Sequence, residues 1–332
     1  MRVLCLTFGD HTQGSTFYRI HQYIAPLSAQ GIHLEPVLAR QFERWQDVPN
    51  YDAVLLQKTL LPAGRLRKLR RLSRRLIYDV DDAIWHPHGK RHFFLTNLRK
   101  NLRLRTIVRA ADLCTAANNV LAAHLRSFRT RVLTLLMALD EQKWKWRDPA
   151  PKPGKLCIGW SGHPVNFRYL QEIEPALLEI QRRFPDVELA VFSGDEPRFQ
   201  SLKFTHVPFV PGTEPEVLRT FDIGLLPLPD DLFSQGKSPI KGLQYLASGA
   251  AVVLSPVGAA AEMFPDGATG LFARNHDGWV TALQKLINDG KLRQELARQG
   301  RRTFEERFSL AANAPQFAAA LTGNQGGGHA GS

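Results

Sequence analysis

The sequence predicts an α/β protein built from two doubly wound domains, each a parallel sheet with helices on both faces. Short apolar runs alternate with helical patterns along both halves of the chain, which is typical of parallel sheets. A proline-rich segment, DPAPKPGK at 148–155, separates the halves and is typical of a linker. We therefore expect an amino-terminal domain over 1–148, a linker over 149–155 and a carboxyl-terminal domain over 156–310.

Each domain is expected to hold six strands, because six short apolar runs of strand length occur in each half. In the first half they lie at 2–7, 34–38, 53–57, 76–80, 112–115 and 131–136. In the second half they lie at 156–161, 187–192, 204–207, 223–226, 251–255 and 271–273. Ligands of such folds bind at the carboxyl ends of the strands, in the cleft that the two domains face, so the loops after these runs are candidate sites.

Basic residues are concentrated in the first half of the chain. The 332 residues carry a net charge of +12; residues 1–150 hold 25 Lys and Arg against 12 Asp and Glu, and residues 151–332 hold 18 against 19. The whole excess belongs to the first half, which predicts an anionic surface or partner for that half. A nucleic acid is not the expected partner, because the basic runs lack interleaved stacking aromatics and a known binding motif.

Composition also indicates the compartment. Cys5, Cys114 and Cys157 have no metal-type spacing and cannot all pair, so we expect buried thiols in a reducing compartment, the cytoplasm. No run of 18 apolar residues occurs, so no membrane span is expected. The opening MRVLCLTFGDHTQG lacks a small-residue cleavage site and is expected to form a buried strand rather than a signal peptide.

Residues 236–262 contain the clearest helix and strand signals. Ser238 and Pro239 are expected to be the N-cap and first residue of a helix, because the Ser hydroxyl accepts an orphan amide and Pro lacks one. Gly249 stands where a helix end belongs, and the apolar run 251–255 follows as a buried strand.

Two lysines, Lys237 and Lys241, lie at the start of this helix with no acid in its first turn. A cation at this positive end of the helix dipole costs about 0.3–1 kcal/mol unless an anion is bound there. The pattern therefore predicts a phosphate site, with Gln244 one turn further on the same face. The alternative is a solvated helix end with two surface lysines.

A second candidate loop follows the first expected strand. Gly14, Ser15 and Thr16 open a helix whose N-terminus faces the cleft and suits a phosphate or an acceptor group. Arg19 can donate two parallel hydrogen bonds to an anion there. The alternative is an N-capped packing helix with a surface arginine.

Three carboxylates, Asp79, Asp81 and Asp82, end the run LIYDVDDAIW. Crowded carboxylates raise one another's pKa unless a cation or bound hydroxyls relieve them. Asp79 is expected to brace nearby backbone, and the alternative for all three is a capping and turn cluster. The nearby histidines at 86, 88 and 92 lack an acid partner, so no metal is expected.

Two basic segments are candidate contacts to an anionic membrane. Residues 65–76, RLRKLRRLSRRL, combine a leucine stripe with seven basic residues, and 90–109 adds seven more, with Phe93, Phe94 and Leu95 as candidate anchors. Each basic residue near an anionic bilayer contributes about 1 kcal/mol. The alternative is a solvated basic face.

The second half resembles glycosyltransferase family 4, the retaining GT-B enzymes that use nucleotide-diphosphate sugars. The likeness covers most of 222–310: the helix of Lys237 and Lys241 resembles the family's donor-binding segment, and RRTFEERFSL at 301–310 matches its closing run. Its S-x-x-G…E…D-G…G-L run is matched by Ser255, Gly258, Glu262, Asp266–Gly267 and Gly270–Leu271. The resemblance also implies that a helix at 311–322 crosses back to the first domain; the Gly-rich residues 323–332 are expected to be a flexible tail.

The resemblance implies roles for particular residues. Donor-binding residues are His163, Arg168, Lys237, Ser238, Lys241, Gln244 and Glu262. Acceptor-side residues are Gly14, Ser15 and Arg19, in a segment similar to the G-S-x-x-Y-R opening of a family subgroup, and the catalytic candidates are Asp81 and Asp82. The family's two glutamates, eight apart, are replaced by Gly236, which cannot contact the donor sugar, and Gln244, which can hold the ribose hydroxyls.

Together these expectations predict a retaining glycosyltransferase that needs no metal and no cofactor. It is expected in the cytoplasm, bound peripherally to the inner face of the membrane. It would move a sugar from a nucleotide-diphosphate sugar to a cell-surface glycan or a lipid-linked acceptor in polysaccharide biosynthesis. Two alternatives are a nucleotide-sugar-binding protein without transferase activity, suggested by Gly236 and Gln244, and a basic nucleic-acid-binding protein.

Overall fold

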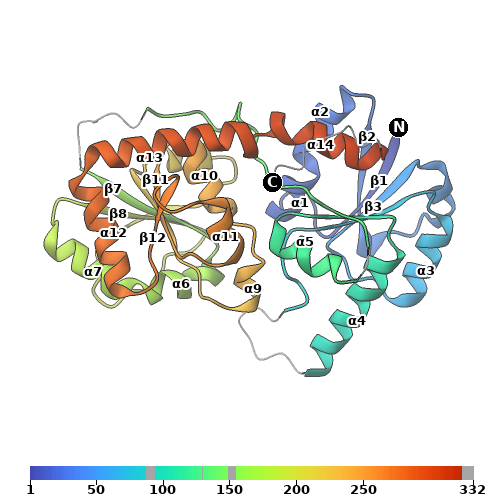
Figure 1. The fold of residues 1–332 in the computed structure, drawn as a ribbon, viewed down its shortest axis with the longest axis horizontal. Coiled ribbons are helices and arrows are strands. Elements are labelled where there is room, and N and C mark those ends of the chain that lie inside the picture. The colour runs from blue at the N-terminus through green and yellow to red at the C-terminus, as the bar shows by residue number, and fades with distance from the viewer. Residues whose placement is uncertain (87–93, 129, 149–154, 324–332) are drawn as a thin grey trace. The chain divides into compact units, whose positions relative to one another are not determined.

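The computed structural model describes residues 1–86, 94–128, 130–148 and 155–323, which form two compact units (Figure 1). The first unit comprises Met1–Ala138, the short segment Gly236–Ser238, and the chain from Leu310 onward. The second comprises Leu139–Gln235 and Pro239–Ser309. Each unit holds one six-stranded sheet in which all pairings are parallel, so the expected two-domain α/β fold is confirmed.

The sheet of the first unit reverses its direction of growth at β1 and β3. Its strands run in the order β2-β1-β3-β4-β5-β6. Their bounds are β1 Arg2–Thr7, β2 His33–Leu38, β3 Ala53–Gln57, β4 Leu76–Val80, β5 Leu113–Ala116 and β6 Val132–Thr134. Because the chain builds outward in both directions from β1 and β3, a crevice is expected at the carboxyl ends of these two strands.

The sheet of the second unit reverses in the same way at β7 and β10. Its order is β12-β11-β10-β7-β8-β9. The bounds are β7 Cys157–Ser161, β8 Glu188–Ser193, β9 Thr205–Pro208, β10 Ile223–Leu226, β11 Ala251–Leu254 and β12 Gly270–Phe272. All twelve strands lie within two residues of the runs that predict them. The central strands are buried on both faces and are therefore continuous apolar runs.

Helices cover the faces of both sheets (Figure 1). Those of the first unit are α1 Gly14–Arg19, α2 Ile24–Ser28, α3 Ala63–Leu72, α4 Phe94–Ala110, α5 Asn119–Arg126 and α14 Leu310–Thr322. Those of the second are α6 Phe167–Glu172, α7 Glu174–Arg183, α8 Glu214–Leu218, α9 Leu232–Gln235, α10 Ile240–Ser248, α11 Gly258–Met263, α12 His276–Asn288 and α13 Gly290–Thr303.

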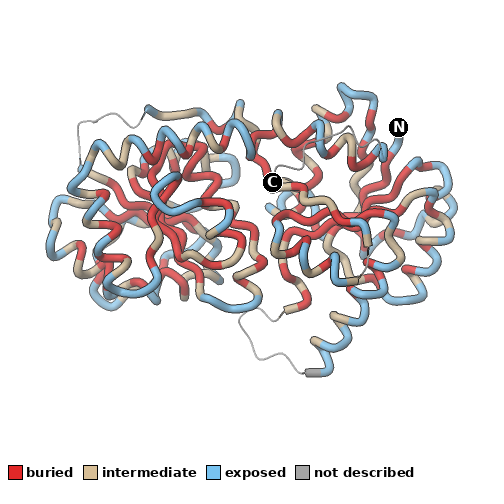
Figure 2. Tube along the Cα trace, viewed as in Figure 1, coloured by how far each residue is buried: buried red, intermediate tan, exposed pale blue. Residues whose placement is uncertain are grey.

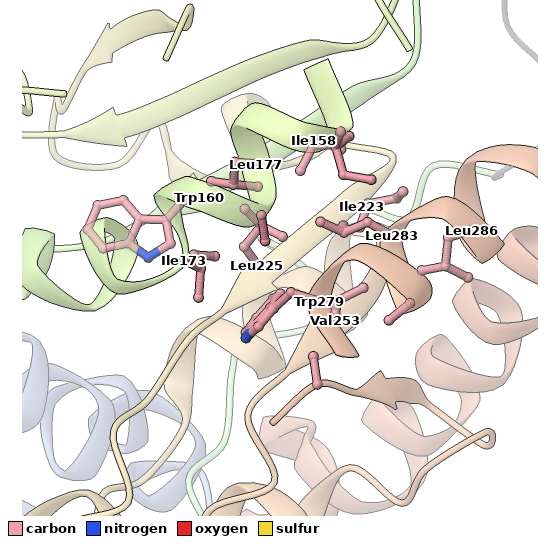
Figure 3. Close-up of a cluster of buried hydrophobic side chains, with 14 of the residues drawn as sticks. Ile158, Trp160, Ile173, Leu177, Ile223, Leu225, Val253, Trp279, Leu283 and Leu286 are labelled. Carbon is pink, nitrogen blue, oxygen red and sulfur yellow. The ribbon is translucent and has the colours of Figure 1, made fainter. Parts of the chain in front are cut away.

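The central strands of each unit are buried beneath these helices (Figure 2). In the second unit, side chains from β7, β10 and β11 interleave with those of α7 and α12, with Trp160 and Trp279 among the largest members (Figure 3). Each sheet therefore has its own apolar core and can position the loops at its carboxyl edge rigidly.

Helix α14 belongs to the first unit, although the sequence reaches it only after the second. Phe317 packs edge-to-face on Tyr23, with ring centroids 4.9 Å apart. The guanidinium of Arg75 donates to the carbonyl oxygens of Leu321 (2.6 Å) and Ala320 (2.9 Å), which are orphan acceptors at the end of the helix. One cation of the basic run 65–76 is thus used to hold the last helix.

The boundary between the units lies before the proline-rich segment. The first unit ends at Ala138, earlier than the expected end at 148, because the residues that follow pack on the second unit. Leu139 donates its amide to Phe308 O at 2.9 Å, and Arg147 forms an ion pair with Asp222 at 2.9 Å. Residues 149–154 of the expected linker and 324–332 of the expected tail lie outside the described residues.

Candidate functional site

Polar side chains gather at the carboxyl edge of the first sheet, where β1 and β3 meet. They come from α1 after β1, from the end of β3, and from β4, β5 and the segments that follow these two strands. The set is Ser15, Thr16, Arg19, Gln57, Lys58, Asp79, Asp81, Asp82, Thr115 and Asn118. This is the position at which doubly wound folds bind ligands.

Arg19 and Asp79 form a buried ion pair beneath this edge. Arg19 donates from Nε to Asp79 Oδ2 at 3.1 Å and from Nη2 to Oδ1, and its Nη1 donates to Leu135 O at 2.6 Å. Thr115 donates to Asp79 Oδ1 at 2.6 Å. Burial alone would lower the pKa of Arg19, but the Asp79 carboxylate outweighs it and the net shift is upward, so the guanidinium stays charged.

This pair corrects two expectations. Arg19 is 2% exposed and its fork is occupied by Asp79, so it is a positioning residue rather than an acceptor contact. Asp79 receives that guanidinium and the Thr115 hydroxyl, where a contact to nearby backbone was expected. Sequence reasoning identified a bidentate donor in Arg19 correctly, but it could not show that the anion belongs to the chain itself.

Lys58 is the cation that relieves the crowded carboxylates, and sequence reasoning missed it. Its Nζ lies 3.2 Å from Asp81 Oδ1 and also pairs with Asp82 Oδ2, while Ser15 donates its hydroxyl to Asp81 Oδ2. Burial would raise the pKa of Asp81, but Lys58 and Ser15 lower it below its usual value. Burial would lower the pKa of Lys58, but Asp81 and Asp82 raise it.

The backbone of Lys58 is held in the left-handed region, with φ of 54°. Among the described residues it is the one non-glycine with positive φ, a conformation that costs about 1 kcal/mol or more. Its amide donates to Asp79 O at 2.7 Å, which helps to hold the turn. A signal for Lys58 was present, because it directly follows the predicted strand 53–57 at the edge where ligands bind.

Gln57 organises the loop after β1. Its Oε1 accepts from Thr16 Oγ1 at 3.0 Å and from the amide of Phe8 at 3.3 Å, and Thr16 Oγ1 accepts from the amide of Gly9 at 3.2 Å. Beside this loop lies a cavity of about 420 Å³ at the carboxyl ends of β1 and β3. It is lined by Thr7, Phe8, Gly9, Asp10, Thr12, Gln13, Arg40 and Thr59.

The loop at Gly14–Ser15–Thr16, expected to bind a phosphate or an acceptor group, instead makes hydrogen bonds within the chain. Helix α1 has only six residues, and the hydroxyls of Ser15 and Thr16 bind Asp81 and Gln57. A Cβ added at Gly14 would lie 3.8 Å from the nearest atom, in the ring of Tyr18, so no close approach requires a glycine there. Of the acceptor-side candidates, Ser15 is the one that contacts Asp81.

In the second unit, α10 begins at Ile240, and the expected Ser238 cap is wrong. Pro239 is the N-cap, with no side-chain hydrogen bond. Ser238, which belongs to the first unit, instead donates its hydroxyl to Asp81 O at 2.9 Å, because the chain enters α10 through this contact rather than a capping turn. Gly249 ends the helix in the left-handed conformation (φ of 90°), as predicted.

The helix start keeps the charge pattern that predicts an anion site. No acid lies in the first turn of α10, and the half-buried Lys241 lies within that turn. Lys237, just before it, is also half-buried. Gln244 is 1% exposed, whereas Glu262, on α11, is exposed.

His163 and Arg168 lie at the carboxyl end of β7, where the second sheet reverses. His163 Nδ1 accepts from the amide of Val165 at 3.3 Å, which makes His163 the N-cap of the following turn, Pro164–Asn166. With Nδ1 as acceptor, a neutral imidazole carries its proton on Nε2 and can donate from there. Arg168 on α6 lies 4.8 Å from the ring centroid of Tyr169 and donates to its hydroxyl at 2.8 Å.

Tyr245 ties α10 to the end of β7, and sequence reasoning missed it. Its hydroxyl accepts from the amide of Ser161 at 2.8 Å, and burial raises the pKa of the phenol. The ring fits over Gly224 of β10, where an added Cβ would lie 2.4 Å from a ring atom. The helix with Lys241 and the loop with His163 are therefore held as one piece.

Three residues of the run that resembles S-x-x-G…E…D-G…G-L have structural contacts. Gly258 has φ of 48°, and a Cβ there would lie 2.1 Å from Gln235 O. Ser255 Oγ accepts from the amide of Leu228 at 3.1 Å, and Asp266 Oδ1 accepts from the amide of Phe272 at 2.8 Å. These contacts shape the loops at the same edge of the second sheet.

The site residues predicted from the sequence thus form one group in each unit. Ser15, Asp81 and Asp82 meet around Lys58 in the first, and Arg19 is withdrawn beneath them. In the second, five candidates lie on segments that follow β7, β10 and β11: His163, Arg168, Lys241, Gln244 and Glu262.

The described ranges contain neither a metal-binding cluster nor a membrane-spanning helix. There, no group of three His, Cys, Asp or Glu side chains is placed to hold a metal ion, and two of the histidines considered, at 88 and 92, lie outside those ranges. Within the same ranges no helix has both the length and the hydropathy to cross a membrane.

Solved structures with the same arrangement identify the fold. Sucrose-phosphate synthase from Thermosynechococcus elongatus matches with a TM-score of 0.73 and 13% identity, over 97% of this chain and 98% of that one. Anabaena HepE, solved with UDP and glucose, matches with a TM-score of 0.70 and 17% identity, over 98% of this chain and 100% of that one. The fold is GT-B.

Other comparisons agree with GT-B. A glycosyltransferase from Rickettsia africae matches with a TM-score of 0.66 and 12% identity, over 98% of this chain and 99% of that one. A family model described as glycosyl transferase-like matches residues 172–319, less than half of the chain. No curated protein sequence matches the chain.

Proposed function

We propose that this GT-B protein is a retaining glycosyltransferase of family 4 that moves a sugar from a nucleotide-diphosphate sugar to a glycan or lipid-linked acceptor. The observation that carries the proposal is the start of α10, where Lys237 and Lys241 meet a helix dipole with no acid in its first turn. The match to HepE, which was solved with UDP-glucose, supports a donor of this class.

The donor is proposed to bind at the start of α10 and at the loops that end the strands of the second sheet. Lys237, Lys241 and Arg168 surround the diphosphate, and His163 donates to it from Nε2, since its Nδ1 is occupied by Val165. The helix entry at Ser238, the amide of Gln244 and the carboxylate of Glu262 complete the donor site. Gln244 serves the ribose hydroxyls through its carbonyl oxygen. No metal or other cofactor is part of this proposal.

The acceptor is proposed to bind the first unit, where Asp81 and Asp82 accept hydrogen bonds from its hydroxyls. Lys58 and Ser15 lower the pKa of Asp81, so its carboxylate is ionised near neutral pH and is an acceptor rather than a general acid. This differs from the two-carboxylate hydrolases, whose acid carries a raised pKa. Rate enhancement then comes mainly from the cations that stabilise the leaving diphosphate.

A thermal-shift screen against UDP, GDP, ADP, CMP and their common sugars tests donor binding. A ligand that binds only the folded chain at 100 times its Kd adds about 2.7 kcal/mol of stability, so one nucleoside diphosphate is expected to raise Tm clearly. UDP and UDP-glucose are the first to test, given HepE. If none of these ligands raised Tm, the proposed donor site would be contradicted.

The variant Lys241→Ala is expected to weaken binding of the nucleoside diphosphate by about tenfold or more, and binding of the nucleoside hardly at all. The reason is that the lysine contributes to the diphosphate and not to the base. Isothermal titration with both ligands measures the difference. Lys285→Ala, an exposed lysine on α12, is the matched control. Equal losses for both ligands would contradict the phosphate site.

A second candidate is a nucleotide-sugar-binding protein without transferase activity. It is favoured by Gly236, where a Cβ would lie 2.8 Å from Ala83 Cβ, so that the acidic side chain of the family has no room in this conformation. Release of free nucleotide from the donor, measured with and without acceptor, separates the two: an enzyme releases it, and a binding protein does not.

A further inference from the structure

Helix α4 of the first unit carries an exposed apolar stripe on the side opposite to the one it buries. Leu95, Leu98 and Leu102 are 68%, 46% and 53% exposed. They are spaced i, i+3 and i+7, which places them on one face at about 100° per residue. Leu104, Ile107 and Val108 are buried and lie on the opposite face. The outer stripe is therefore not part of the core.

The first half of α4 extends beyond the rest of the first unit, and most of its surface is exposed (Figures 1 and 2). Exposing an apolar stripe to water is unfavourable in free energy, so such a stripe on an extending helix indicates a partner that covers it. Arginines border the stripe on both sides, and all four are exposed: Arg99, Arg103, Arg105 and Arg109. Within the described part of the chain, none of these arginines has an acid partner.

The positive charge of α4 indicates which kind of partner covers the stripe. The sequence 94–110 contains five basic residues and no acid. A second copy of the chain, seated stripe to stripe, would bring two such sets of cations together without counter-charge. An anionic bilayer satisfies both features, because the leucines enter the acyl boundary while the long arginine side chains reach the headgroups.

The other basic run does not have this form. In α3, Arg65 and Lys68 lie over the ring of Trp45, and Arg70 pairs with Asp112 at 3.1 Å. Arg75, just beyond α3, holds the end of α14. Leu66 and Leu69 are buried in the unit. Of the two basic segments that the sequence offers as membrane contacts, the one in α4 is therefore the candidate. Phe93 lies outside the described residues.

We propose that the Leu95–Leu98–Leu102 face of α4 docks the first unit on a membrane surface rich in anionic lipid. The inference rests on the proposed function in one respect: the membrane on which α4 docks would contain the lipid-linked acceptor that the first unit is proposed to bind. Its physical basis, an arginine-bordered leucine stripe, is independent of any transfer reaction.

Sedimentation of the full chain with vesicles tests the proposal. Vesicles of phosphatidylcholine alone and of phosphatidylcholine with phosphatidylglycerol are compared at low and high salt. We expect capture by the anionic vesicles at low salt and weaker capture at high salt. The triple variant L95S/L98S/L102S, altered only at exposed positions, is expected to bind about tenfold more weakly or worse.

Charge variants give the matched control. R99Q/R103Q on α4 is expected to reduce vesicle binding about tenfold, whereas R67Q/R71Q, exposed cations of α3, removes the same charge with a smaller loss. Three results would overturn the proposal: no capture by anionic vesicles, undiminished capture of the leucine variant, or a dimer in analytical ultracentrifugation that the leucine variant abolishes. Thermal shift with UDP in the absence of lipid reports the donor site separately, so failure of one proposal does not imply failure of the other.

Discussion

Replacing Arg19 by methionine is expected to destabilise the first unit by about 3–5 kcal/mol. The substitution leaves the Asp79 carboxylate buried with no cation, and an uncompensated buried charge costs this much. It also removes the donor that Leu135 O accepts from at 2.6 Å. Denaturant unfolding followed by circular dichroism measures the loss.

Two controls separate the ion pair from general effects at this position. Arg67→Met changes an exposed arginine of α3 and is expected to alter stability by less than about 0.5 kcal/mol. The double variant Arg19→Met/Asp79→Leu removes both charges and is expected to recover much of the loss. A loss below about 1 kcal/mol in Arg19→Met would show that the pair is not a structural element of this sheet edge.

Replacing Lys58 by methionine is expected to reverse the pH dependence of stability at acid pH. In the native chain the pKa of Asp81 is lowered in the folded state, so the associated stability is present above the unfolded value, about 3.9, and is lost as the pH falls. Without Lys58, burial is the largest remaining influence and raises the pKa of Asp81. The variant then gains stability relative to the native chain as the pH falls from 7 toward 4.

Melting temperatures of the native chain and of Lys58→Met between pH 4 and pH 7 measure this reversal. At pH 7 the variant is expected to be less stable by about 3 kcal/mol, because two carboxylates lose their shared cation. It is also expected to lose the proposed transferase activity, since the Asp81 carboxylate no longer keeps its charge and position. Lys68→Met, an exposed lysine of α3, is the control. Parallel pH profiles for both variants would contradict the assigned role of Lys58.

Prediction from the sequence was most successful where one local pattern decides the structure. The central strands are buried, continuous apolar runs, and Gly249 ends α10 because a left-handed C-cap suits glycine. The carboxyl-edge position of the candidate residues follows from strand–helix alternation alone. The start of α10 was placed wrongly, because Ser238 binds Asp81 O instead of capping the helix.

Local pattern was thus enough for the two parallel sheets, for the edge at which the candidate residues lie, and for the two lysines at the start of α10. It could not show which charges meet. Arg19 and Asp79 are 60 positions apart, and Lys58 reaches Asp81 and Asp82 from the neighbouring strand. Parallel pairing of β3 with β4 brings Lys58 to the carboxylates, and pairing of β1 with β3 brings α1 to the same edge, where Arg19 meets Asp79 and Ser15 meets Asp81. Such pairings depend on strand order and register, which folding sets through packing of the whole sheet rather than through any single segment.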